Sequence, residues 1–508
     1  FDYVGVPQSS VAEWLGANVA AGQKIGFDPW LHTADEIDKL KILLEETSVT
    51  LLSTSNIIDS IWQDQPAAPL GLAFPHPDTL AGETSTDKRK RLADGLSGAG
   101  QRAAVITLPD SLCWLLNIRG ADVPRNPVLH GFAILHDDAR VTLFADSAKF
   151  DAATRAHLGP DVTLKPVDAF VAALRSLQGP VRVDNMTAPL AVSQELKAAG
   201  IDVVWGDDPC RLPKARKNAA EIQGTRDAHL RDGAAMVEFL CWLDLQTPKG
   251  GLTEIDVVRA LEGFRRATNL LHDISFDTIS GSGPNGAIMH YRVTGETNRT
   301  IGQNELLLVD AGAQYRDGTT DITRTIAVGD PGHEARQAYT RVLQGMIAIS
   351  RVRFPKGLAG RDLDPLARFH LWVAGQDFDH GTGHGVGTFL SVHEGPQRLS
   401  RISEVPLEPG MILSNEPGYY REGAFGIRLE NLIVVQPAPD LPGGDARIQY
   451  QFETITFVPL DRRLILSDDL SVGDRAWLNA YHRETLEKLG LRLSPSALEW
   501  CQAACAPL

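Results

Sequence analysis

The apolar and polar positions of the first 200 residues alternate in short runs, as expected for brief strands and helices. The predicted elements are, in chain order, a strand over residues 24–28, an amphipathic helix over 34–46, a strand over 48–53, a basic helix over 85–96, a strand over 103–108, a hairpin of 131–135 against 141–144, and a strand over 181–184. Such alternation is typical of mixed α/β domains.

A longer helical period begins after about residue 215. One buried stripe keeps the i, i+3, i+4, i+7 spacing through Met236, Phe239, Leu240 and Leu243. The sequence Thr247-Pro-Lys-Gly-Gly251 ends this helix, because proline and glycine do not continue it. Thr253-Glu-Ile-Asp256 then fits a capping box. The pattern therefore predicts two consecutive helices.

Two breaks in the pattern divide the chain into three predicted domains. Residues 64–69 contain two prolines in four positions, which block both a helix and a strand ladder. Residues 207–217 combine proline and charge without periodicity, directly before the long helix. We therefore expect domains over residues 1–66, 67–214 and 215–508, of which the first is small for a domain of its own.

Two acidic residues lie in a predicted hairpin of the third domain. Asp310 ends an apolar run over residues 305–312, and Asp321 begins a strand over 321–328. A two-residue turn at Asp317-Gly318 would place Asp310 opposite Thr325. Asp310 and Asp321 would then share a face but lie two pleats, about 13 Å, apart. A bend or a different turn is needed to bring the two carboxylates together.

A second predicted hairpin brings two glutamates together directly. A three-residue loop over 422–424 pairs a strand over 411–418 with one over 425–435, and Glu416 then lies opposite Glu430. Opposed Cβ atoms are about 5 Å apart, and like charges there are destabilising unless a cation lies between them. Two metal ions bridged by carboxylates lie about 3.5 to 4 Å apart, a separation that this pair can span.

The motif His380-Gly-Thr-Gly-His384-Gly-Val-Gly has four glycines among eight residues, so it predicts neither a helix nor a packed strand. The glycines between its histidines argue against the helical His-Glu-x-x-His zinc motif. One histidine can bind a metal while the other faces the substrate. His290 and His393 are weak signals alone. The sequence Gly281-Ser-Gly-Pro-Asn-Gly286 matches a dinucleotide pattern, but no strand-loop-helix unit surrounds it.

The acids and the second histidine of this motif form one candidate metal site. A single acid at a strand end usually caps or is solvated, and a single histidine is more often a core residue than a ligand. Together they lie in apolar surroundings where unpaired carboxylates are costly, which favours metal binding. The set is rich in oxygen and has no thiolate, so it suits Mn²⁺ better than a structural zinc, although Zn²⁺ and Co²⁺ stay open. The candidate ligands are Asp310, Asp321, His384, Glu416 and Glu430.

Composition narrows the class of protein. The chain has 508 residues, 43% apolar residues and a net charge of -15 with a pI near 5.4, so nucleic acid and anionic membranes are improbable partners. No run approaches the roughly 18 apolar residues of a membrane span, and no signal peptide opens the sequence. The five cysteines are scattered outside any Cys-x-x-Cys pattern, which indicates reduced thiols and favours the cytoplasm.

Several motifs of the third domain resemble the pita-bread metallopeptidases, and most closely the Xaa-Pro aminopeptidase (aminopeptidase P) branch. The matching segments are residues 283–291, 310–325, 380–387, 392–396, 415–420 and 426–431. The resemblance covers nearly the whole chain, and it is to the long form of the family, which has three domains. It implies two creatinase-like mixed α/β domains before a pita-bread domain. The family's first domain is larger than residues 1–66, so by this resemblance we expect the beginning of that domain to be missing from this sequence.

By this resemblance, Asp310 binds one of two divalent ions, Asp321 and Glu430 bridge both, and His384 and Glu416 complete the second. The attacking group is a hydroxide that bridges the two metals. Glu416 acts as general base and proton carrier, His290 and His393 stabilise the oxyanion, and His380 shapes the pocket for the proline ring. The implied substrates are peptides with proline second, cleaved after the first residue. The resemblance also suggests a homodimer.

Two other functions remain open at this stage. A prolidase uses the same ligands on dipeptides, but the long region before the third domain and the sequence Gly286-Ala-Ile-Met-His290-Tyr favour the aminopeptidase. A non-catalytic binding protein with the same fold would have lost metal ligands, whereas all five positions are filled here. Cleavage assays and metal analysis separate these readings.

Overall fold

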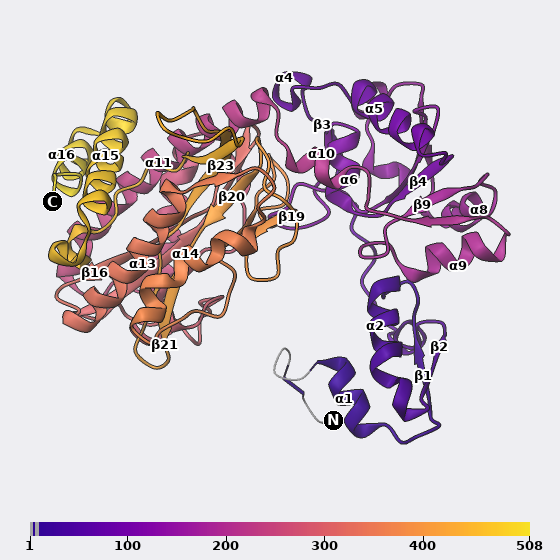
Figure 1. Cartoon of the computed structure of the whole chain (residues 1–508), viewed down its shortest axis with the longest axis horizontal. Helices are drawn as coiled ribbons and strands as arrows, with labels where there is room; N and C mark the ends of the chain where they lie inside the picture. Colours follow the sequence, from indigo (N-terminus) through magenta and orange to yellow (C-terminus); the bar gives the residue numbers. More distant parts are fainter. Residues whose placement is uncertain (1–3, 6–9) are drawn as a thin grey trace. The chain divides into compact units, whose positions relative to one another are not determined.

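The computed structural model describes residues 4–5 and 10–508, and the chain divides into two compact units (Figure 1). The first unit comprises the described part of Phe1–His76 with Glu83–Val123 and Val128–Arg211. The second comprises Pro77–Gly82, Pro124–Pro127 and Leu212–Leu508, and it holds every candidate site residue. The three domains inferred from the sequence, with a separate domain before residue 66, stay a prediction.

A mixed six-stranded sheet, ordered β10-β9-β4-β6-β7-β8, forms the centre of the first unit. Helices α8 and α9 bury apolar side chains against it, among them Phe170, Leu174 and Val192. A parallel pair, β1-β2, and a short pair, β3-β5, complete the strands. The strands are β1 (Lys24–Phe27), β2 (Thr50–Ser53), β3 (Phe74–Pro75), β4 (Ala103–Ile106), β5 (Ile118–Arg119), β6 (Phe132–His136), β7 (Val141–Phe144), β8 (Val162–Lys165), β9 (Val181–Val183) and β10 (Val203–Trp205).

Two helices of the first unit were predicted from the sequence pattern, and the structure contains others besides them. The helices are α1 (Val11–Asn18), α2 (Ala34–Leu44), α3 (Ile57–Ile61), α5 (Ser85–Gly98), α6 (Pro109–Leu115), α7 (Ala152–Leu158), α8 (Phe170–Arg175) and α9 (Leu190–Ala198). The predicted helices over 34–46 and 85–96 are confirmed as α2 and α5, and each begins with a threonine cap, Thr33 and Thr84. Within the described residues, no helix is long and apolar enough to cross a bilayer.

The second unit contains two three-stranded sheets, β11-β14-β15 and β12-β13-β16, the six-stranded sheet β17-β24-β23-β20-β18-β19, and the hairpin β21-β22. The strands are β11 (Leu271–Ile274), β12 (Ile279–Ser282), β13 (Glu305–Ala311), β14 (Ala313–Tyr315), β15 (Gly318–Thr319), β16 (Ile322–Val328), β17 (Arg353–Pro355), β18 (Gly383–Gly385), β19 (Glu394–Leu399), β20 (Ile412–Asn415), β21 (Gly418–Arg421), β22 (Phe425–Arg428), β23 (Asn431–Pro437) and β24 (Gln449–Thr454).

Helices lie on both faces of these strands. The helices of the second unit are α4 (Asp78–Ala81), α10 (Arg211–Ala215), which crosses the boundary between the units, α11 (Ala219–Gln246), α12 (Glu254–Arg266), α13 (His333–Arg351), α14 (Gly360–Val373), α15 (Val472–Leu489) and α16 (Pro495–Ala504). The two consecutive helices expected after residue 215 are confirmed as α11 and α12, and the capping box of Thr253 and Asp256 is present.

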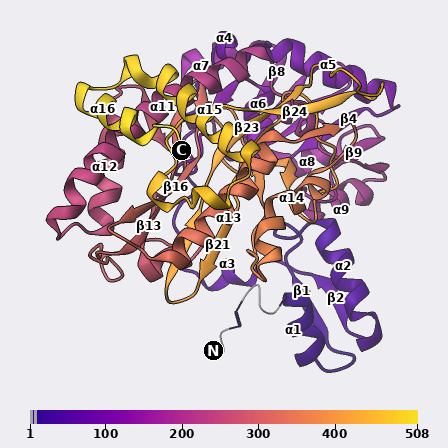
Figure 2. The same ribbon diagram turned by 60° about the vertical axis from the view of Figure 1, so that its left-hand side comes forward.

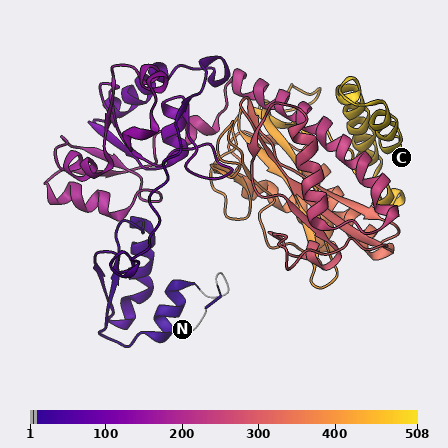
Figure 3. The same cartoon turned by 180° about the vertical axis from the view of Figure 1, so that it is seen from behind.

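Alternate residues of the central strands point to opposite helix layers. Leu413 and Ile433 pack with residues of α13 and α14, which cover one face (Figure 1). Ile412 and Leu432 pack on the other face with Ile222 of α11, the long helix that Figure 3 shows from behind. The C-terminal helices α15 and α16, yellow in Figure 2, pack beside α11. The strands are apolar at consecutive positions because both faces are covered.

The first acidic hairpin has a different register from the predicted one. Asp310 lies opposite Thr323, so the predicted pairing with Thr325 is wrong. Tyr315 pairs with Gly318, which makes Arg316-Asp317 the two-residue turn. Gly318 serves a close approach instead, since a Cβ there would lie 2.8 Å from the Cα atom of Thr225 in α11. The register shift of two residues keeps Asp310 and Asp321 on one face and leaves them one pleat apart.

The second acidic hairpin has the predicted register. Arg421 pairs with Phe425 around the three-residue loop, and Asn415 pairs with Asn431 farther along the strands. Glu416 and Glu430 lie in the short interruption between these paired segments, and the same register on either side places them opposite each other. Pro417 interrupts the ladder without shifting it.

Candidate metal centre

A pocket of about 580 Å³ opens over the acidic hairpins of the second unit. Residues from β13, β18 and the β20–β22 region meet in it with loops that carry three further histidines. All eight candidate residues line this one pocket: Asp310, Asp321, His384, Glu416, Glu430, His290, His380 and His393. Side chains far apart in the sequence are therefore brought to one place.

The glycines around His384 allow neighbouring strands to approach closely. A Cβ atom on Gly383 would lie 1.9 Å from the backbone oxygen of Ser414, and one on Gly385 would lie 2.3 Å from that of Glu394. Any side chain at either position would push β18 away from β20 or β19. The expectation that these glycines allow close backbone approach is thus confirmed, and the result is a fixed position for His384.

The His384 ring directs a lone pair at two carboxylates. Its Nδ1 atom lies 2.8 Å from the carbonyl oxygen of Gly385, which only accepts hydrogen bonds, so Nδ1 carries the proton. In the neutral ring, Nε2 is then an acceptor, yet it lies 3.3 Å from Glu416 Oε1 and 3.5 Å from Asp321 Oδ2. Three acceptors that converge in this way need a proton or a cation among them, and one metal ion can satisfy all three. A backbone carbonyl that orients a histidine is also the usual support for a metal ligand.

Two further carboxylate oxygens in the pocket are buried without a hydrogen-bond partner in the described structure. They are Asp310 Oδ1 and Glu430 Oε1. The other oxygen of each is held: Asp310 Oδ2 accepts from Arg428 at 2.6 Å, and Glu430 Oε2 accepts from Thr323 at 2.7 Å. One ligand atom each from Asp321, His384 and Glu430 lies within 4.8 Å of the others. The donor set fits divalent metal ions.

Burial and mutual repulsion raise the pKa values of the carboxylates. The pKa of Asp321 lies well above its ordinary value because the group is buried and Asp310 and Glu416 are close. Burial, Asp321 and Glu416 have the same effect on the pKa of Glu430. Burial also raises the pKa of Glu416, although His384 and Arg428 oppose the shift. Such clusters of acids are typical of functional sites.

These shifts predict how the metal-free protein responds to pH. The folded chain keeps protons on Asp321 and Glu430 that the unfolded chain releases near pH 4, so ionising them destabilises the fold as the pH rises above that value. Bound metal ions require the ionised groups and remove this penalty. We therefore expect the Tm difference between Mn²⁺-loaded and chelated protein to widen from about pH 5 to about pH 8. Calorimetry across this range measures it, and a constant difference would contradict the prediction.

Two histidines lie beside the candidate ligands with nitrogens available to a substrate. The rings of His384 and His393 meet edge to face with centroids 4.3 Å apart. Desolvation, together with His384 and His290, lowers the pKa of His393 to about 4. His393 is therefore neutral near pH 7 and can donate a hydrogen bond from its ring. His290 lines the same pocket from the loop after β12.

His380 has both ring nitrogens occupied. Nδ1 donates to the carbonyl oxygen of Gly381 at 2.8 Å, and Nε2 accepts from the Tyr420 hydroxyl at 2.8 Å. Arg428 Nη1 donates to that hydroxyl at 2.7 Å, so the hydroxyl must donate its own hydrogen to His380 Nε2. Burial and Arg428 lower the pKa of His380 to about 3. His380 thus presents only ring carbons to the pocket, as a wall without a free donor or acceptor.

Sequence reasoning assigned no role to three residues that organise the site. Arg428 bonds Asp310, Tyr420 and Thr323, and Thr323 in turn bonds Glu430. Ser414 donates to Glu416 and accepts from the backbone N–H of His384. Position offers a signal for Arg428, since it precedes Glu430 by two residues and so faces the same side of the strand. Nothing comparable marks Ser414 or Thr323.

Comparison with known proteins places matches along nearly the whole chain. The family described as creatinase/prolidase N-terminal domain matches residues 64–221. Metallopeptidase family M24 matches residues 223–437, and the C-terminal region of peptidase M24 matches residues 449–508. Aminopeptidase P2 from Arabidopsis thaliana is 38% identical over 544 residues, which cover 99% of this chain and 76% of that protein. A probable Xaa-Pro aminopeptidase P from Aspergillus oryzae is 38% identical over 94% of this chain and 75% of its own length.

Solved structures show the same relationship. An X-prolyl aminopeptidase from Caenorhabditis elegans, described as a cytosolic enzyme with a di-nuclear active site, superposes with a TM-score of 0.93 and 34% identity over 99% of this chain and 84% of that chain. A Xaa-Pro dipeptidase from Bacillus anthracis reaches a TM-score of 0.60 and 26% identity over 74% of this chain and 99% of that chain. The similarity to the aminopeptidase is thus both more complete and closer.

Proposed function

The chain belongs to metallopeptidase family M24, and on this premise we propose that it is a metal-dependent aminopeptidase that releases the first residue of peptides with proline in the second position. The relatives named above support this activity over that of a prolidase. The observation that carries the proposal is the convergence of His384 Nε2 with Asp321 and Glu416 oxygens beside a histidine wall that has no free nitrogen.

We propose that two Mn²⁺ ions occupy the site. Asp310, Asp321, His384, Glu416 and Glu430 would hold them. The unpartnered oxygens of Asp310 and Glu430 support this assignment, and the oxygen-rich set supports Mn²⁺. When bound, the ions supply Lewis acidity, which lowers the pKa of a water molecule toward neutrality and polarises the peptide carbonyl. Metal analysis after chelation and reloading tests the assignment.

Glu416 is the proposed proton carrier. A carboxylate at this position can accept a proton from the attacking water and then give it to the leaving nitrogen. Ser414 donates to Glu416 Oε1 at 2.9 Å and so keeps the carboxylate in place. The leaving nitrogen belongs to proline, which has no N–H before cleavage and gains one proton when the bond breaks.

His393 and His290 are the proposed hydrogen-bond donors to the carbonyl oxygen. Charge develops on this oxygen when the carbonyl carbon becomes tetrahedral, and donors aimed at it stabilise the transition state more than the substrate. The neutral state of His393 supports this role, because its ring can donate without adding a positive charge beside the metal ions. His380, with ring carbons toward the pocket, would pack against the proline ring.

Peptide length separates the two related activities. We expect the Mn²⁺-loaded protein to cleave Ala-Pro-Ala and longer peptides after the first residue, with a higher kcat/KM than for the dipeptide Gly-Pro. A matched series with alanine in place of proline serves as the control for proline selectivity. Efficient turnover of Gly-Pro alone would identify a prolidase. Metal binding without cleavage of any peptide in the series would identify a binding protein.

Two further properties complete the proposal, a homodimer and a cytoplasmic location. The side chains of Leu366, Phe369 and Val373 form an exposed apolar stripe at i, i+3, i+7 on α14, and Val373 is 74% exposed, which supports a protein interface on the second unit. Light scattering measures the oligomeric state.

Two observations support the proposed cytoplasmic location: the C. elegans relative is described as cytosolic, and the five free cysteines are buried. Imaging of a tagged protein tests this location.

A further inference from the structure

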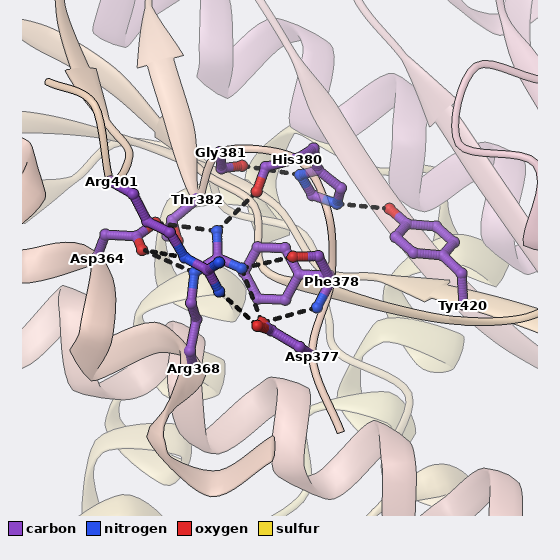
Figure 4. Close-up of polar contacts among 9 residues, drawn as sticks. All are labelled: Asp364, Arg368, Asp377, Phe378, His380, Gly381, Thr382, Arg401 and Tyr420. Atoms are coloured by element: carbon purple, nitrogen blue, oxygen red, sulfur yellow. Dashed lines mark hydrogen bonds and ion pairs between the residues drawn. The ribbon is translucent and has the colours of Figure 1, made fainter. Parts of the chain in front are cut away.

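Arg368 is a buried arginine that lies outside the candidate ligand set, on the inner side of α14. Only 2% of its side chain is exposed. It pairs with Asp364 one turn earlier, through Nε at 2.7 Å and Nη2 at 3.2 Å (Figure 4). Nη1 also bonds Asp377 at 2.8 Å. A bidentate pair of this kind fixes the plane of the guanidinium group.

The remaining bonds of Arg368 go to the backbone of the segment that carries His380. Nη2 donates to the carbonyl oxygen of His380 at 2.7 Å, and Nη1 donates to that of Phe378 at 2.6 Å. The guanidinium carbon also lies 3.8 Å from the centre of the Phe378 ring. Figure 4 shows the segment from Asp377 to Thr382 wrapped around this one side chain. Arg368 therefore holds the segment at two carbonyl groups, those of Phe378 and His380, which are two residues apart.

The far end of the same segment is tied to Asp364 and to Glu416. Thr382 Oγ1 donates to Asp364 Oδ1 at 2.7 Å. The backbone N–H of Glu416 donates to the carbonyl oxygen of Thr382 at 2.8 Å. The pair of Asp364 and Arg368 thus connects α14 to both the backbone of His380 and that of the proposed proton carrier.

The position of the His380 ring follows from two independent supports. Tyr420 and Arg428 bond the ring nitrogen from the strand side, and Arg368 bonds the backbone of the same residue from the helix side. A buried ion pair is seldom needed for stability alone, because apolar residues of similar volume often serve as well. The buried pair contributes fixed geometry here, because the five donors of the planar guanidinium group hold two carbonyl groups and two carboxylates at defined positions.

We propose that Arg368, held by Asp364, is a positioning residue that fixes the place of the His380 ring in the pocket wall. It thereby determines the selectivity for a five-membered ring in the second position of the substrate. This inference rests on the proposed function. A shift of the His380 ring changes how closely the pocket encloses the proline ring of the substrate, and it leaves the metal ligands in place. Its signature is therefore a change in KM and ring-size preference, with kcat and metal content nearly unchanged.

The test compares Arg368→Lys with Arg401→Gln in the full-length, Mn²⁺-loaded protein. Lysine keeps the charge but lacks the planar fork with which the arginine bonds two carbonyl groups and two carboxylates at once. Arg401 is a matched control, because it pairs with the same Asp377 from the solvent side and lies 4.0 Å from Asp364, yet, in the described structure, it bonds neither the His380 nor the Phe378 backbone. The substrates are Ala-Pro-Ala and the same tripeptide with six-membered pipecolic acid instead of proline. Metal content and Tm are measured for each variant.

For Arg368→Lys we expect KM for Ala-Pro-Ala to rise about tenfold, kcat to change less than about threefold, and the preference for proline over pipecolic acid to narrow about tenfold. Arg401→Gln keeps the wild-type preference. A folded Arg368→Lys protein with the wild-type preference overturns the inference, as does equal loss for both substrates. If this variant does not fold, Asp364→Asn is judged by the same criteria. Wild-type protein without proline preference overturns the proposed function as well.

Discussion

Glu416→Gln is expected to abolish turnover of proline-second peptides while the fold is retained. The amide keeps the size of the side chain and its bond to Ser414, but it cannot accept and return a proton. Loss of a positioned general base costs about 10²- to 10⁴-fold, and loss of one anionic ligand adds to this, so we expect kcat to fall by about 10³-fold or more. Steady-state kinetics at saturating Mn²⁺ measures the effect.

A second variant controls for the loss of a carboxylate as such. Glu453 on β24 pairs with Arg226 and does not line the pocket, so Glu453→Gln should leave kcat unchanged. Circular dichroism and metal analysis of both variants show whether Glu416→Gln keeps its fold and at least one ion. Near-normal turnover of Glu416→Gln would remove this residue from the mechanism.

Arg428→Met is expected to damage the site without touching a proposed ligand. The guanidinium bonds Asp310 at 2.6 Å and the Tyr420 hydroxyl at 2.7 Å, and methionine leaves both partners buried without it. Breaking a buried pair costs about 3 to 5 kcal/mol of stability in other proteins. Groups that support metal ligands usually account for about 10- to 100-fold in affinity or activity. We expect a loss near the upper end of that range, because Arg428 supports both Asp310 and His380.

The control is Arg231→Met, since Arg231 makes a bidentate pair with Asp317 that is also largely buried and lies outside the pocket. Equilibrium unfolding, Mn²⁺ titration and kcat/KM are measured for both. Arg231→Met should lose stability while its metal affinity stays at the wild-type level. If Arg428→Met binds Mn²⁺ and cleaves substrate as the wild type does, the structural role assigned to Arg428 is wrong.

Local rules predicted the glutamate pair from the sequence. A three-residue loop and the two-residue period of a strand are enough to place Glu416 opposite Glu430, and Pro417 does not disturb that register. Both faces of these strands are buried, so a slip by one residue would move every side chain to the opposite face, which is packed against different helices. The register is fixed by packing as well as by the turn, which is why the simple rule succeeds.

The same rules failed by two residues at the first hairpin. Asp-Gly is a strong turn signal, but Gly318 is required where the strand meets α11, and the turn forms one residue earlier. That contact involves Thr225, more than ninety residues away in the chain. No local pattern contains it. The correct register reduces the gap between Asp310 and Asp321, which the sequence left unresolved, from two pleats to one.

The supporting residues were the hardest to predict. Arg368 and Arg428 act through backbone carbonyls, a tyrosine hydroxyl and a distant aspartate, and each of these partners comes from a separate element. An arginine in an amphipathic helix or a strand is more often solvated than buried. Only the fold distinguishes Arg368 from the many exposed arginines of the chain, whereas the position of Arg428 two residues before Glu430 was a signal in the sequence.

The central claim, a two-metal site that performs proline-directed hydrolysis, is tested most directly by one titration. Mn²⁺ is added stepwise to chelated protein while bound metal and cleavage of Ala-Pro-Ala are measured on the same samples. We predict saturation at two ions per chain, with activity that appears as the sites fill and disappears on renewed chelation. Full activity in metal-free protein, or folded protein that binds no Mn²⁺, would contradict the claim.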